Sequence, residues 1–172
     1  MVRCPGCGLE LPGVADEVST RPGASAACWR LFGEVQGYEM QHLAQVGRFH
    51  QLLVDTYAAQ HPVSDGPTIG VAFALIGLHL ALDEGWRGDQ VRDAHQAMAR
   101  AHREWPRFRP PDEHARSTVF DLAMAASPEA YAEALWTWAG EVWEAWRDAH
   151  QAVDTLLMDM LPADEWARLK SG

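Results

Sequence analysis

The first residues of the chain that could do chemistry are two cysteines near its start, in the run Cys4-Pro5-Gly6-Cys7-Gly8. Two thiolates at this spacing can bind one metal ion, and glycine lets the backbone turn tightly enough to direct its N–H groups toward sulfur. A redox dithiol would need the cysteines at the start of a helix, which Gly6, Gly8 and Pro12 oppose. The motif therefore favours a metal site over a redox pair or two free thiols in a tail.

The rest of the chain must supply two more ligands if the site is a closed zinc site with four nitrogen or sulfur ligands. Cys28 is the one cysteine that remains, and its alternative role is burial as a small hydrophobe beside Trp29. The fourth ligand must then be a histidine or a carboxylate. His50 and His61 both project from an otherwise apolar helical stripe, and the sequence does not choose between them. We expect one Zn²⁺ site with a structural role, while the sequence leaves iron open as the metal.

A second group of polar and aromatic residues is a candidate ligand-binding site. Trp143, Trp146 and His150 share a face of the predicted last long helix, and Asp55 and Tyr57 are polar groups on a largely apolar helix. Together they are candidates to form an aromatic-lined pocket with a histidine at its rim, for a small ligand or a second metal. The alternative is an aromatic core with a hydrogen-bonded histidine.

Composition narrows the possible partners and the location. The formal net charge of −10 over 172 residues has the wrong sign for a nucleic-acid partner. The most apolar stretch, Ile69 to Leu82, is too short to cross a bilayer, and no signal peptide precedes the cysteines. An odd number of cysteines with a C-x-x-C pair suits a metal site in a reducing cytosol. We expect a cytoplasmic protein with no membrane or nucleic-acid partner and an unknown small-molecule or protein partner.

The segments that must position these residues are predicted to be helices, preceded by an irregular N-terminal segment. Residues 1–24 contain repeated glycine and proline and are expected to be irregular. A short helix should begin near Ser25 and bend at Gly33 and Gly37. Further helices are expected over 39–60, from 67 to about 84, from 89 to 105, over 119–125, and from 128 to 161 as the longest element, followed by a terminal turn near Trp166.

These patterns predict an all-α protein: a single domain over 1–172, with a helical bundle and an N-terminal segment that carries the metal knuckle. The stretch before Leu82 is apolar all round, as expected of a central buried helix, and Gly70 and Gly77 would permit close helix contact. The turn at 64–67 should precede it. No internal repeat is visible.

The order of these motifs resembles a known bacterial family. The Cys-x-x-Cys-Gly run, then Cys28-Trp29, then the run from His50 to Pro62 are similar to domain-of-unknown-function family 5946, with Val54 to Pro62 as the most specific part. The segment from Trp138 to His150 resembles the C-terminal part of that family. Ala74 stands where members of that family tend to carry a histidine. The resemblance implies a small cytoplasmic bacterial protein and implies no activity.

Two functions stay open at this stage. The first is a zinc-stabilised helical protein with a binding or interaction role, in which the metal fastens the N-terminus to the bundle. The second is a metal-dependent enzyme, by analogy with DinB-like bundles that place histidines from facing helices around one ion. The enzyme would need His50, His61 and His150 to converge with one coordination position open. A sensor that binds a small ligand on its tryptophan-lined face is a weaker third idea.

Overall fold

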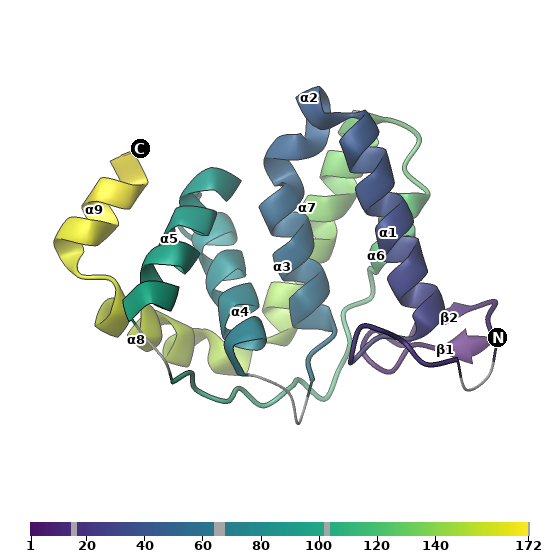
Figure 1. The fold of residues 1–172 in the computed structure, drawn as a ribbon, viewed down its shortest axis with the longest axis horizontal. Coiled ribbons are helices and arrows are strands. Elements are labelled where there is room, and N and C mark those ends of the chain that lie inside the picture. Colours follow the sequence, from purple (N-terminus) through teal and green to yellow (C-terminus); the bar gives the residue numbers. More distant parts are fainter. Residues whose placement is uncertain (15–16, 64–67, 102–103, 172) are drawn as a thin grey trace.

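Helices make up most of the protein, and they pack around one buried helix (Figure 1). The computed structural model describes residues 1–14, 17–63, 68–101 and 104–171. The α-helices are α1 (Ala26–Gln41), α2 (Leu43–Val46), α3 (His50–Gln60), α4 (Thr68–Leu82), α5 (Gly88–Ala101), α6 (Val119–Ala123), α7 (Pro128–Ala145), α8 (His150–Met160) and α9 (Ala163–Ser171). The prediction of an all-α bundle with an irregular N-terminal knuckle segment is confirmed. The turn expected at 64–67 lies outside the described residues.

The buried centre of the bundle is α4, which packs against α3, α5, α7 and α8. Leu75, Ile76, Leu78 and Leu80 are fully buried on it, as an all-apolar helix requires. Its two glycines differ in role. A Cβ at Gly77 would collide with the side chain of Asp55 on α3, whereas a Cβ at Gly70 would meet no atom within 4 Å.

The N-terminal segment forms a small antiparallel hairpin that the sequence did not predict. Strands β1 (Val2–Arg3) and β2 (Glu10–Leu11) pair with Val2 opposite Leu11. Between them, the Cys4 N–H donates to the Leu9 carbonyl, and Gly8 adopts a positive φ of 74° that closes the turn. The hairpin lies below the start of α1, at the opposite end of the long axis from α9 (Figure 1).

Helix α1 runs unbroken from Ala26 to Gln41, so the bend predicted at Gly33 and Gly37 is wrong. A Cβ at either glycine would meet nothing within 4 Å, so the missing side chains remove no packing. The opposite face of the helix is buried at Cys28, Phe32, Val35 and Glu39. Packing of this face outweighs the roughly 1 kcal/mol by which each glycine disfavours a helix.

Both long helices that the sequence predicted are interrupted, and each break contains a short 3₁₀ turn. The first break contains α2 and η1 (Gly47–Phe49), and the second contains η2 (Arg147–Ala149). At the second break, Trp146 is buried and its indole Nε1–H donates to the Ala59 carbonyl of α3 at 3.1 Å. Before this point α7 packs on α2, α3, α4 and α6, whereas after it α8 packs mainly on α4.

The two interrupted helices share a pattern that was not recognised as a repeat. His50 and His150 each follow a 3₁₀ turn and each begin an 11-residue helix. Pro62 and Pro162 then stand at the same distance from these histidines. The chain thus twice places a 3₁₀ turn before an 11-residue helix that begins at a histidine, although α2 stands before the first turn and has no counterpart before the second.

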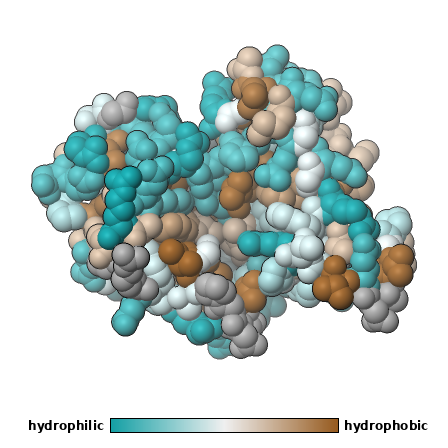
Figure 2. Space-filling model, viewed as in Figure 1, coloured by the Kyte–Doolittle hydropathy of each residue, from teal (hydrophilic) through white to brown (hydrophobic). Residues whose placement is uncertain are grey.

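The surface in Figure 2 is mostly hydrophilic, with small hydrophobic patches scattered over it. Within the part of the chain that the structure describes, no helix is both long and apolar enough to cross a membrane.

Candidate metal centre

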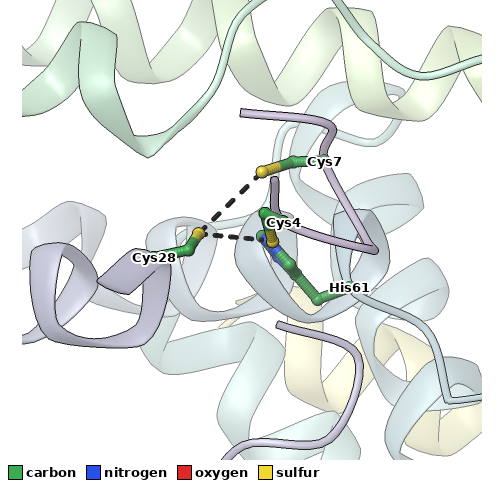
Figure 3. Close-up of side chains that lie close together, drawn as sticks. All are labelled: Cys4, Cys7, Cys28 and His61. Atoms are coloured by element: carbon green, nitrogen blue, oxygen red, sulfur yellow. Dashed lines mark hydrogen bonds between the residues drawn. The ribbon is translucent and has the colours of Figure 1, made fainter. Parts of the chain in front are cut away.

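Four buried side chains with metal-binding atoms meet where the N-terminal hairpin, the start of α1 and the end of α3 come together. They are Cys4, Cys7, Cys28 and His61, and their ligand atoms all lie within 4.8 Å of one another (Figure 3). Their exposed fractions range from 0% to 5%. The residues are separated by up to 57 positions in the sequence, so the fold must create this cluster.

Two distances between the donor atoms fit tetrahedral coordination. A tetrahedral zinc ion with Zn–S bonds of about 2.3 Å and a Zn–N bond of about 2.0–2.1 Å separates two sulfurs by about 3.8 Å and a sulfur from a nitrogen by about 3.5 Å. Cys7 Sγ lies 3.9 Å from Cys28 Sγ, and Cys28 Sγ lies 3.4 Å from His61 Nε2. The three cysteines are free thiols, so no disulfide competes for these sulfurs.

The imidazole of His61 is oriented for metal binding by its own helix. Its Nδ1–H donates to the Tyr57 carbonyl at 2.8 Å, which leaves the Nε2 lone pair facing the thiols. A histidine ligand usually makes such a second hydrogen bond, because it fixes both the tautomer and the ring position. His61 is the C-cap of α3 and precedes Pro62, so the helix ends with the ring at the cluster.

Two glycines let the hairpin approach this ring. A Cβ on Gly6, between the two knuckle cysteines, would lie 2.5 Å from the Gly23 carbonyl oxygen and 2.6 Å from His61 Cδ2. Gly23 has a φ of +82°, and a Cβ there would lie 2.7 Å from the His61 carbonyl oxygen. The segments that pass His61 at Gly6 and at Gly23 therefore fit only with glycine at these two positions.

Cys28 reaches the cluster from the first turn of α1. Ser25 caps the helix by accepting a hydrogen bond from the Cys28 N–H, and the Ser25 N–H donates to Cys4 Sγ at 3.4 Å. The Tyr57 hydroxyl donates to Cys28 Sγ at 3.6 Å. The helix N-terminus and these N–H and O–H donors all favour thiolates over thiols.

The three sulfurs of the cluster compete for protons. Hydrogen bonds from Cys28 and then Cys7 hold the pKa of Cys4 below its usual value. The pKa of Cys7 is raised by its hydrogen bonds with Cys28 and Cys4 and by burial, and the pKa of Cys28 rises to about 11, chiefly through its hydrogen bond with Cys4. One thiolate thus forms at the expense of the others, and a divalent cation would stabilise all three.

His50, the other histidine that the sequence offered as a ligand, lies outside the cluster. It begins α3 whereas His61 ends it, and 11 residues of helix rise by about 16 Å. Its Nδ1 pairs with the fully buried Glu39 of α1, and this hydrogen bond raises the pKa of His50. The apolar stripe that carries both histidines therefore reaches two separate places: the Glu39 contact at the start of α3 and the cysteine cluster at its end.

The three-histidine site of the alternative hypothesis does not form. Among the described residues, the Cys4–Cys7–Cys28–His61 cluster is the one group of three or more such side chains that could hold a metal ion. His150 stacks on Trp143, with ring centroids 3.7 Å apart, and its Nε2–H donates to the Trp143 carbonyl. His50, His61 and His150 thus contact different parts of the protein: Glu39, the cysteine cluster and Trp143.

The five residues proposed for ligand binding are also dispersed. Tyr57 lies at the metal cluster, and Asp55 lines a cavity between α3 and α4. Trp143 donates through Nε1 to Asp83 at 3.0 Å, and Trp146 donates to α3 instead. Of the predicted aromatic face, Trp143 and His150 do lie together as stacked rings, whereas the Trp146 indole donates to the Ala59 carbonyl of α3.

The sequence did not indicate the roles of three residues that contact His50, Asp55 and His61, namely Glu39, Gly77 and Gly23. Glu39 gave no signal, because a single glutamate near a helix end is usually solvated. Gly77 was noted as a contact residue but not as the space for a carboxylate. Gly23 read as part of an irregular segment, and its positive φ is evident only once the hairpin folds back on His61.

Comparison with known proteins gives one family. A family model described as a family of unknown function (DUF5946) matches residues 2–147, which include all four residues of the metal cluster. This match agrees with the resemblance inferred from the sequence. Neither the curated proteins nor the solved structures contain a match to the chain.

Proposed function

We propose that this chain, which belongs to the family of unknown function DUF5946, is a zinc-binding helical protein whose metal fastens the N-terminal hairpin to the bundle. One observation carries the proposal: four buried donor atoms from three separate segments lie within 4.8 Å of one another, and the Cys7–Cys28 and Cys28–His61 distances match those of a tetrahedral site. Three thiolates and one imidazole are a typical ligand set for structural zinc.

A structural role follows from the closed shape of the site. Structural zinc sites use four protein ligands, whereas catalytic sites keep one position for water or substrate. The cluster offers four protein donor atoms, enough to fill a tetrahedral zinc sphere, and every one of the four residues is buried. We therefore propose that the protein acts by binding or interaction rather than by chemistry at this metal.

The donor set also bears on where the protein works. The ligands must be reduced thiols to bind the ion, so a reducing compartment such as the cytoplasm would keep the site competent. Oxidation of Cys7 and Cys28, whose sulfurs lie 3.9 Å apart, would remove two ligands at once.

Elemental analysis of the purified chain tests the proposal, with two histidine variants as a matched pair. Wild-type protein from metal-replete cells should carry one zinc ion per chain, and so should His50→Ala. His61→Ala and Cys28→Ser should lose most of the metal, because a site with three remaining ligands binds far more weakly. The proposal is wrong if the wild type carries no stoichiometric metal, or if His50→Ala loses it while His61→Ala does not.

A further inference from the structure

A cavity of about 480 Å³ lies at the opposite end of α3 from the metal cluster. It is lined by η1, the first turns of α3, the second half of α4 and the start of α5, and by Trp136 of α7. The outline of the molecule in Figure 2 is indented between α2 and α5, close to these elements. Its volume falls within the range of small-molecule sites, roughly 300–1,000 Å³.

Asp55 lines this cavity and is only 4% exposed. Both of its carboxylate oxygens accept from the same donor, Gln51 Nε2, at 3.0 Å each. Among the described residues, no cationic side chain lies within ion-pairing distance of Asp55. A carboxylate can accept about four hydrogen bonds, so most of the capacity of this buried group is unused.

The fold makes specific room for this carboxyl group. A Cβ on Gly77 of α4 would lie 2.0 Å from Asp55 Oδ2, so no other residue fits opposite it. A glycine inside a helix costs about 1 kcal/mol and a poorly paired buried carboxyl costs more. Two unfavourable features that meet at one cavity wall indicate a binding site rather than ordinary core packing.

The other walls define what the ligand should look like. Trp86 also lines the cavity, and its indole Nε1–H is buried without an acceptor in the described structure. Phe49 and Trp136 add aromatic surface. Arg48, Arg87 and Arg92 line the cavity as well, and they are more exposed than Asp55.

We propose that this cavity binds a small zwitterion, with a guanidinium or ammonium head on Asp55 and a carboxylate toward the arginines. The head supplies the N–H donors that Asp55 lacks, and a guanidinium can do so with two parallel hydrogen bonds. A flat body between the two ends stacks on the aromatic walls. The site is separate from the metal cluster and does not depend on the zinc proposal.

Calorimetric titration of the full-length, metal-loaded chain with 4-guanidinobenzoate tests the proposal. This probe carries a guanidinium and a carboxylate at opposite ends of an aromatic ring. Saturable one-to-one binding is expected, weakened at least tenfold by Asp55→Asn. Asp159→Asn, which makes the same change at an exposed position of α8, should bind like the wild type.

Two altered probes separate the two ends of the ligand. 4-Ureidobenzoate replaces the cation by a neutral group of the same shape, and phenylguanidine lacks the carboxylate. Each should bind at least tenfold more weakly than the zwitterion. Arg92→Gln should weaken binding of 4-guanidinobenzoate while leaving phenylguanidine binding unchanged.

The proposal is overturned if 4-guanidinobenzoate shows no saturable binding, if Asp55→Asn binds it as the wild type does, or if all three probes bind equally. Metal content measured on the same samples distinguishes this result from a failure of the zinc site. Circular dichroism on each variant shows whether it is folded. The two altered probes are titrated into the wild type, so their result does not depend on the folding of any variant.

Discussion

Asp55 is a carboxyl group buried in a helical interior with one neutral hydrogen-bond donor. Burial raises its pKa well above the usual value, while the hydrogen bond from Gln51 opposes the shift. Charged groups on the same cavity come from η1 and from the start of α5: Arg48, Arg87, Asp89 and Arg92. None of these four forms an ion pair with Asp55, so the folded protein favours the neutral acid.

This buried acid makes stability depend on pH. Above the unfolded-state pKa of about 3.9, the folded protein holds a proton that the unfolded chain has released, so stability falls as pH rises toward the folded-state pKa. Asp55→Asn removes that dependence. We expect the variant to unfold at the same urea concentration as wild type below pH 4, and to be more stable by about 1–3 kcal/mol near pH 8.

Urea unfolding at a series of pH values measures this difference, with Asp159→Asn as the control that should show no gain. Parallel curves for wild type and Asp55→Asn across the whole range would mean that the carboxyl is paired after all. A gain in stability together with loss of zwitterion binding would mark Asp55 as a residue kept for function at the expense of stability.

The choice between His50 and His61 shows what residue-level reasoning can and cannot predict. Both histidines fall on one apolar stripe, and the stripe predicts that both side chains face the interior of the bundle. Which one meets the thiols depends on where α3 begins and ends, since the two rings lie at opposite ends of it. The one local sign in favour of His61 was Pro62, which ends the helix next to it.

At the scale of elements, the metal cluster joins the hairpin, the first turn of α1 and the end of α3. Other contacts hold α1 independently of the metal, because Phe32 stacks on Tyr57 with centroids 3.9 Å apart and the helix packs on α6. The hairpin has two-residue strands, and besides the cluster its partly buried Leu9 and Leu11 pack against the core. Metal loss should therefore release the hairpin first.

Chelation of the metal-loaded protein is expected to expose residues 1–14 and the first turn of α1 to hydrogen exchange, while α3, α4 and α7 stay protected. The reason is that metal binding supplies much of the folding energy of a small metal-held segment, whereas the helical body has its own core. Peptide-resolved hydrogen exchange before and after chelation makes the comparison. Uniform loss of protection across the chain would show instead that the ion holds the whole bundle together.

Helix breaks were the elements that sequence patterns predicted worst. Gly33 and Gly37 suggested a bend that packing overrides, whereas neither 3₁₀ turn was predicted, because residues 43–49 and 146–149 continue the helical periodicity. The second break arises where Trp146 turns to donate to α3. Such a break depends on a partner 87 residues away, so no local pattern contains it.

At the scale of the whole molecule, the fold class and the three cysteines of the candidate metal cluster were predictable from residue types and spacing. The all-apolar stretch before Leu82 predicted the central helix, and the knuckle and Cys28 predicted the sulfur ligands. The cavity at Asp55 was not predictable, because it requires Gly77 on α4 to face α3 at one particular register. The recurrence of a 3₁₀ turn before an 11-residue helix was equally hidden, since few residues besides His50, His150 and the two prolines share its spacing.

X-ray absorption spectroscopy at the zinc edge, on wild-type protein purified without added chelator, tests the central claim most directly. It reports the type, number and distance of the atoms bound to the ion. The cluster of Cys4, Cys7, Cys28 and His61 predicts three sulfurs at about 2.3 Å and one nitrogen at about 2.0–2.1 Å. Fewer than three sulfurs, a bound water in place of the imidazole, or protein without zinc would contradict it.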